Sequence, residues 1–253
     1  MASDQLVFFL SGLIGFGPAI GVLYHALRTF DYPYTEKSYF DTRRIFLALA
    51  VGMVVGTVTG AISVGFRLAI TSLLALVVFL LLLALFEEAL KLVYLNRKGY
   101  RGRFDTTFVG VSLGIGVAAI VSAGSSYSNG PALFAVSNVA TLLGFSISLA
   151  LVHGATGAIL GYGTSHGEVV VALAQAFFAR VLHAGMLVPF FVWSSLPNPE
   201  SQVAIPLFSL AAAVAFTLLL YVWVYRHVLP DTLPPELRRE RRRRVRATRT
   251  AKE

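Results

Sequence analysis

Long apolar stretches constrain this chain more than any other feature of its sequence. A bilayer has a hydrocarbon core of about 30 Å, which a helix of about 20 residues can cross. Backbone groups cannot stay unpaired in lipid, so apolar stretches of this length are expected to be helices, whereas barrel strands would be short and alternating. Seven suitable stretches cover residues 6–27, 45–65, 68–94, 106–123, 133–162, 169–194 and 203–227.

The composition excludes an ordinary soluble domain. Hydrophobic residues make up 56% of the 253 residues and charged residues only 13%, so too much apolar surface would remain in contact with water. The chain has no cysteine, which excludes disulfides and thiolate metal sites. Its first residues carry Asp4 and no basic residue, so the first stretch is expected to be retained rather than cleaved as a signal peptide. We predict an all-α, multi-pass protein of the cell membrane, with one seven-helix domain over residues 1–229.

The distribution of Lys and Arg predicts how the chain is oriented. Loops rich in these residues tend to stay in the cytoplasm. The connections near 124–132 and 195–202 contain no basic residue, and the connection at 162–168 is placed inside without any Lys or Arg to support it. The first and third connections are rich in basic residues and are therefore expected inside, which places the N-terminus outside and the C-terminus inside. These basic residues are Arg28, Lys37, Arg43, Arg44, Arg97, Lys98, Arg101 and Arg103.

The last segment, residues 230–253, is strongly basic. From Glu236 to Glu253 it has nine basic and three acidic residues, a net charge of +6 out of +8 for the whole chain. We expect a disordered cytoplasmic tail that lies against anionic lipid, with a protein partner as the alternative. Nucleic acid is not expected as a partner, because no aromatic residues or folded module accompany the arginines. The short loops elsewhere favour a prokaryotic, and in particular an archaeal, source.

Small residues recur at four-residue spacing in two of the stretches. Such ladders let the backbones of membrane helices approach closely. The ladder of the second stretch is expected to pack within the chain, whereas that of the fourth could pack within the chain or face another protein. The two ladders consist of Gly52, Gly56 and Gly60, and of Gly110, Gly114, Ala118 and Ser122.

Ionisable side chains inside the apolar stretches point to the place where function should be sought. A charge at bilayer depth costs about 2.5–3.5 kcal/mol on insertion scales, so such residues usually face the bundle interior and have a partner or a function. We expect them to converge at a similar depth. They are Glu87, Glu88, Lys91, His153, Arg180 and His183.

The residues alone leave three interpretations of this cluster open. Two histidines and a glutamate could bind zinc while the second glutamate activates water, although the HExxH spacing is missing. The glutamates could act as a general base without a metal. Alternatively, Arg180 and Lys91 neutralise the glutamates, and the histidines hydrogen-bond across helices.

The order of several short segments resembles a known family. The segments are GFGPAIGVL, FEEALKLVYLNRKGY, GVSLGIG, LVHGATG and LHAGM, and they follow one another as in the anterior-pharynx-defective scaffold subunit of γ-secretase. The resemblance implies seven spans, an outside N-terminus and a non-catalytic scaffold without a cofactor. It implies assembly through Gly110 and Gly114, with Ala118 in place of a third glycine, and buried histidines at His153 and His183. Other membrane helices, including a presenilin-like aspartyl protease, would be the partners.

The same segments also resemble an enzyme class. EEALK is similar to the EExxK motif of PrsW-type and prenyl-protein-processing intramembrane proteases. Under this alternative the protein is an endopeptidase that uses Glu87, Glu88, His153 and His183, with zinc as a possible cofactor. The resemblance is incomplete, because Val121 and Ser122 replace a glutamate-asparagine pair and Leu187 replaces an Asn or Asp. The scaffold is therefore the preferred prediction.

Overall fold

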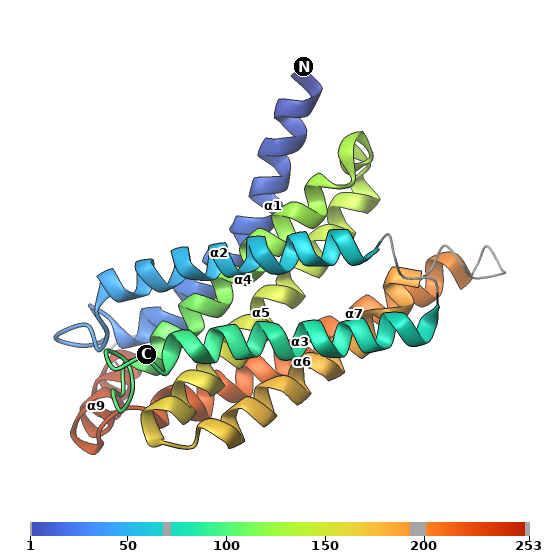
Figure 1. Ribbon diagram of the computed structural model, residues 1–253. Helices are drawn as coiled ribbons and strands as arrows, with labels where there is room; N and C mark the ends of the chain where they lie inside the picture. Colours follow the sequence, from blue (N-terminus) through green and yellow to red (C-terminus); the bar gives the residue numbers. More distant parts are fainter. Residues whose placement is uncertain (1, 68–71, 193–200, 251–253) are drawn as a thin grey trace.

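Seven long helices form the body of the protein. The computed structural model describes residues 2–67, 72–192 and 201–250, and in this part the seven helices are long and apolar enough to cross a membrane. The prediction of an all-α, multi-pass membrane protein is confirmed for the described residues. The expected start of the third span at residue 68 and the expected end of the sixth at residue 194 lie outside the described residues. The helices are α1 (Ala2–Leu27), α2 (Thr42–Arg67), α3 (Leu73–Leu95), α4 (Thr106–Tyr127), α5 (Val136–His166), α6 (Val169–Val192) and α7 (Ser201–Trp223) (Figure 1).

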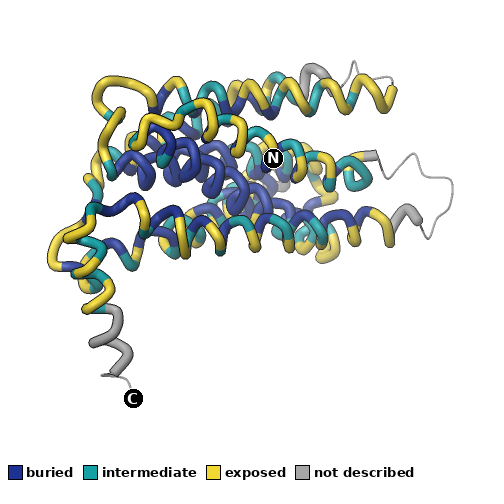
Figure 2. The backbone as a smooth tube through the Cα atoms, turned by 90° about the horizontal axis from the view of Figure 1, so that it is seen from below, coloured by how far each residue is buried: buried dark blue, intermediate teal, exposed yellow. Residues whose placement is uncertain are grey.

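The helices α4 and α5 form the centre of the bundle. Figure 2 shows this centre as the most continuous buried part of the chain. α4 packs on α5, α2 and α1, and α5 packs on α4, α6 and α7. Helix α3 runs along the outside and touches mainly α6 and α5. It is thus a peripheral helix, although it carries three of the six ionisable residues of interest.

The small-residue ladder of α4 faces inward, which corrects the prediction that it could face a partner. A methyl group built on Gly110 would overlap the carbonyl oxygen of Gly157, and one on Gly114 would overlap that of His153. Both carbonyls belong to α5. The remaining members of the ladder, Ala118 and Ser122, are also buried. The physical reason is that α4 lies between neighbours on several sides, so its small residues are used to bring α5 close.

The ladder of α2 is internal over only part of its length. Gly52 and Gly56 pack against the backbone of α4 at Leu113 and Val117, in agreement with the expected packing within the chain. A methyl group added to Gly60 would have no heavy atom within 4 Å, so this glycine makes no such contact. Gly60 therefore lies outside the close contact between α2 and α4.

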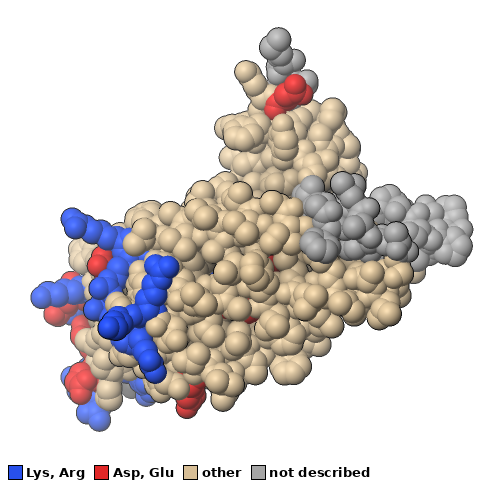
Figure 3. Space-filling model, in the orientation of Figure 1, with Lys and Arg blue, Asp and Glu red and all other residues tan. Residues whose placement is uncertain are grey.

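Basic residues gather at one end of the bundle, together with the C-terminal segment (Figure 3). Shorter elements lie at the connections: η1 (Arg28–Phe30), η2 (Gly130–Phe134), the π-helical η4 (Val224–Val228), α8 (Leu229–Asp231) and α9 (Pro235–Thr250). This clustering is what the positive-inside pattern requires, and the placement of that end in the cytoplasm stays a prediction.

The C-terminal segment is helical where the sequence predicted disorder. Helix α9 begins at Pro235, and proline is well suited to the first turn of a helix. Arginine and glutamate, which dominate the segment, also have good helix propensity. Arg241 of α9 lies 4.4 Å from the centre of the Phe30 ring, and Arg244 pairs with Glu36. These contacts with the first connection give the helix a surface on which to order.

Candidate functional site

The inner face of α3 is polar in its last three turns. Glu87, Glu88 and Lys91 are buried there, on the same side as Ala84 and Leu95. Residues spaced by three, four and seven positions lie on one helix face, so the apolar residues and the charged residues share a single packing surface. The sequence thus directs two acids and one base into the bundle from a single peripheral helix.

A compact triangle joins Lys91 and Glu88 to α5. The Lys91 ammonium donates to Glu88 Oε1 at 2.5 Å and to the Thr156 hydroxyl at 2.9 Å. The Thr156 hydroxyl also lies 3.2 Å from Glu88 Oε1 and donates to it. All three side chains are fully buried. This cluster fixes α3 against α5.

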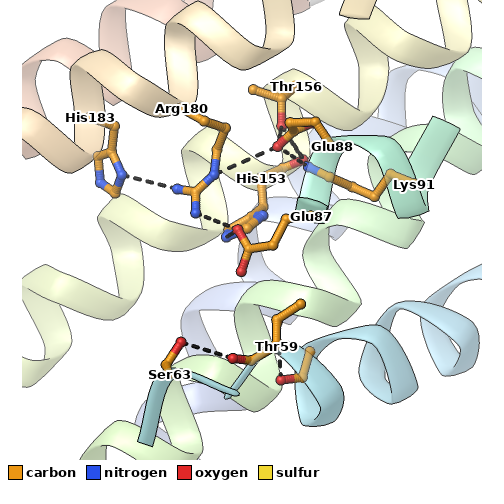
Figure 4. Close-up of polar contacts among 10 residues, drawn as sticks. Thr59, Ser63, Glu87, Glu88, Lys91, His153, Thr156, Arg180 and His183 are labelled. Atoms are coloured by element: carbon orange, nitrogen blue, oxygen red, sulfur yellow. Dashed lines mark hydrogen bonds and ion pairs between the residues drawn. The ribbon is translucent and has the colours of Figure 1, made fainter. Parts of the chain in front are cut away.

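Arg180 of α6 joins the second acid to a histidine. Its Nη2 donates to Glu87 Oε2 at 2.6 Å, and its Nε lies 3.6 Å from Glu88 Oε1 (Figure 4). Its Nη1 lies 3.2 Å from Nδ1 of His183, which can only accept from a guanidinium. Nε2 of His183 then carries the proton and donates to the Ser148 hydroxyl at 2.7 Å. The chain of contacts ties α3, α6 and α5 together.

The charges of the site compensate one another. Two carboxylates face one ammonium and one guanidinium, so the group is neutral when both histidines are neutral. Breaking a buried pair by removing one partner typically costs about 3–5 kcal/mol, because an uncompensated charge remains.

Helix α2 lies beside the site but is not hydrogen-bonded to it. Ser63 donates to the Thr59 carbonyl of its own helix, and no hydrogen bond joins either residue to Glu87 among the described residues (Figure 4).

His153 differs from the other members of the site. It is fully buried, yet neither of its ring nitrogens has a hydrogen-bond partner in the described part of the chain. Its Nε2 lies 3.9 Å from Glu87 Oε2, which is too far for a hydrogen bond. A buried polar atom without a partner typically costs about 1–3 kcal/mol. Unlike His183, His153 therefore keeps both ring nitrogens unengaged, and Glu88 Oε2 and Arg180 Nε also have no hydrogen-bond partner among the described residues.

The arrangement does not fit the zinc site that the sequence left open. Both nitrogens of His183 are engaged, with Ser148 and Arg180, and Oε2 of Glu87 is held by Arg180. Lys91 likewise holds Oε1 of Glu88. Within the described residues, no three of His, Cys, Asp and Glu form a group that could hold a metal ion.

The structure brings together all six ionisable residues that the sequence singled out, and it adds two that the sequence missed. Thr156 and Ser148 of α5 bind Lys91 and His183 respectively. Both are hydroxyl residues in an apolar helix. Such hydroxyls often bond to carbonyls of their own helix, as Thr164 does to Leu160, so sequence alone gives no signal that separates the two uses.

Comparisons with known proteins do not place this chain in a family. No family model matches its sequence, and neither a curated protein nor a solved structure matches it. The likeness to the γ-secretase subunit and to the intramembrane proteases therefore stays a prediction from the short segments.

Proposed function

We propose that this protein is a non-catalytic membrane scaffold that resembles the anterior-pharynx-defective subunit of γ-secretase and binds other membrane helices. The observation that carries the proposal is the pairing of both buried carboxylates with cations of the same chain. Glu87 is held by Arg180 and Glu88 by Lys91, and the exposed fraction of Glu87 is only 3%. A general base needs a carboxylate oxygen within hydrogen-bond reach of the proton that it removes. Here the Arg180 guanidinium and the Lys91 ammonium occupy one oxygen of each acid, Glu87 Oε2 and Glu88 Oε1.

The docking face of such a scaffold must be sought outside the α4 ladder. Gly17 and Gly21 of α1 are four residues apart and exposed, and a methyl group added to either would have no heavy atom within 4 Å. Large apolar side chains flank them, and Leu13, Ile20 and Tyr24 are each more than half exposed. A small-xxx-small pattern with open space suits the close approach of another helix. The proposal therefore assigns partner binding to the outer face of α1.

Co-purification from native membranes tests this assignment. Gly21→Leu is expected to remove bound membrane proteins while the isolated protein keeps its thermal unfolding temperature. Gly185→Leu is the matched control, since Gly185 of α6 is also exposed with open space around it and α6 packs on α3, α5 and α7. An identical set of retained proteins for the wild type and Gly21→Leu would refute docking at α1.

An intramembrane endopeptidase is the second candidate, and His153 is the observation that favours it. An imidazole with two free nitrogens lies 3.9 Å from the Glu87 carboxylate, so a shift of Arg180 would let the two groups meet. Catalytic hydrogen bonds are often long before a substrate binds and tighten only in the complex.

Purified protein with membrane peptides decides between the two candidates. The scaffold predicts no cleavage by the wild type. Cleavage that is lost in Glu87→Gln and Glu88→Gln, but kept in Glu236→Gln on the exposed C-terminal helix, would replace the scaffold with the enzyme.

A further inference from the structure

A second site lies at the basic end of the bundle, away from the buried ion pairs. There a cavity of about 210 Å³ opens where the end of α5, the start of α6 and the end of α7 meet. Its polar and aromatic lining comes from Tyr162, Glu168, Gln175, Trp223, His227 and Asp231. None of these residues takes part in the cluster around Glu87 and Arg180.

The helix that lines this cavity departs from regular α-helical geometry. Residues 224–228 form η4, a π-helical segment at the end of α7, and it supplies His227 and Val228 to the wall. π-helical turns are rare and occur frequently at functional sites. The wider turn lies between Trp223 and Asp231, so it sets how these two lining residues are positioned relative to each other along the helix. The cavity and the irregular helix are two separate observations that coincide in one place.

The charge of the lining is opposite to that of its surroundings. The end of the bundle is rich in Lys and Arg (Figure 3), yet the lining contains two carboxylates and neither Lys nor Arg. One of these carboxylates, Asp231, already forms an ion pair of 3.0 Å with Arg238. Glu168 is exposed, and no cation pairs with it within the described residues. Glu168 is therefore the unpaired charge of the lining, and a cation is the ligand that would pair with it.

The lining also specifies the kind of cation. The carboxylates of Glu168 and Asp231, the side-chain carbonyl of Gln175 and the Tyr162 hydroxyl can all accept hydrogen bonds. Trp223 and Tyr162 add ring faces, which attract cations. A primary ammonium group has three donors to satisfy such acceptors, whereas a quaternary ammonium has none.

Size and position narrow the ligand further. Pockets that hold whole small molecules usually measure about 300–1,000 Å³, so this smaller cavity suits a headgroup-sized part of a ligand. Its rim includes Val171, which is 55% exposed, and Trp223, which is 46% exposed. Tryptophan at the end of a membrane helix is typical of the depth at which lipid headgroups lie.

We propose that this cavity binds a primary ammonium group, as carried by the headgroup of an ethanolamine phospholipid. The ammonium would lie between Glu168 and Asp231 against the ring of Trp223. Basic side chains of the same end, such as Arg226 next to the π-helical His227, are available for the lipid phosphate. The site would thus recognise both charges of a zwitterionic headgroup.

Native mass spectrometry of the purified full-length protein tests the proposal. The protein is equilibrated with phosphatidylethanolamine, with its trimethylated counterpart phosphatidylcholine of the same acyl chains, or with free phosphoethanolamine. We expect phosphatidylethanolamine to be retained at least about fivefold better than phosphatidylcholine, because the trimethylated headgroup has no N–H to donate to the carboxylates. If free phosphoethanolamine at equal concentration displaces the lipid, the ammonium group that the cavity binds comes from a soluble amine rather than from a lipid.

Two variants connect retention to the cavity. Glu168→Gln and Trp223→Leu are each expected to reduce retention of the amine lipid by about tenfold, on the scale of one charge-assisted contact. Glu236→Gln and Phe208→Leu are the matched controls, since both residues are exposed and neither lines the cavity. Thermal unfolding of each variant without added lipid checks its fold. Equal retention of the two lipids, or unchanged retention in a folded Glu168→Gln, would overturn the proposal.

Discussion

The central pair of helices and the peripheral helix α3 are held in the bundle by different kinds of contact. In the apolar stretches of α4 and α5, 78% and 83% of the residues are buried, against 17% in α3. α4 and α5 approach each other through glycines, so that backbone touches backbone. α3 is attached near its basic end by three buried charged residues.

The difference follows from what each helix can gain in lipid. Apolar side chains of α3 gain little by leaving lipid for protein, since lipid tails are as apolar as leucine. Close backbone packing holds α4 against α5. At the periphery, α3 is held by ion pairs with Arg180 and by a hydrogen bond to Thr156, which is a neutral partner. The buried charges of this protein thus have a structural role, because they attach α3 to α5 and α6.

The largest effect is expected where the central pair is disturbed. Gly114→Ala places a methyl group against the backbone of His153, where no side-chain rotation can relieve the overlap. We expect a loss of at least about 3 kcal/mol in stability, at the upper end of overpacking effects. Thermal unfolding in detergent and the yield of monodisperse protein measure it. Gly124→Ala in the same helix has open space and serves as the control, and equal behaviour of the two variants would break the comparison.

The second effect concerns the attachment of α3. Arg180→Met leaves the Glu87 carboxylate buried without its main partner, and we expect a loss of about 3–5 kcal/mol. The double variant Arg180→Met/Glu87→Gln removes both charges and should recover most of that loss. A double variant that unfolds as easily as Arg180→Met would show that the ion pair does not hold α3. Thermal unfolding gives the coupling between the two positions.

A smaller effect is expected at the contact between α9 and the first connection. Arg241 lies over the ring of Phe30 and donates to the Thr29 hydroxyl at 3.3 Å. Arg241→Ala should lower stability by about 0.5–2 kcal/mol, the range for a cation above an aromatic ring. Arg243→Ala, at an exposed position of the same helix, should change little. Limited proteolysis of the C-terminal segment reports whether α9 has come away.

The smallest effect is a loss of stability at alkaline pH that arises from Tyr39. Burial raises the pKa of Tyr39 above its usual value of 10.0, and the Glu240 carboxylate adds to this rise. The folded state therefore favours the neutral phenol, so its contribution to stability is complete below pH 10 and is lost as the pH rises further. The hydroxyl is buried without a hydrogen-bond partner among the described residues. Tyr39→Phe should be at least as stable as the wild type at pH 7, since it removes an unpartnered buried hydroxyl, and should lose less stability above pH 10, as thermal unfolding across pH would show.

The sequence predicts the spans and the polar cluster well, for reasons that also explain where it fails. Span length and the cost of buried charge depend only on composition along the chain, so the helices and the convergence of Glu87, Glu88 and His153 could be foreseen. The direction of the α4 ladder could not, because Gly110 and Gly114 satisfy the same spacing rule whether the neighbour is α5 or another protein. Pro235 and the arginines of the tail favour a helix locally, but the contacts of α9 with Phe30 and Glu36 of the distant first connection could not be foreseen.

The length of α5 has a consequence for the membrane around the protein. Its 31 residues extend about 46 Å, well beyond a hydrocarbon core of about 30 Å. Figure 1 shows α1 and the adjoining ends of α4 and α5 rising away from the direction that α2 and α3 follow. The two groups of helices cannot both stand upright in one bilayer. At least one group must therefore tilt, and the thickness of the surrounding lipid becomes a factor in how far the two groups diverge.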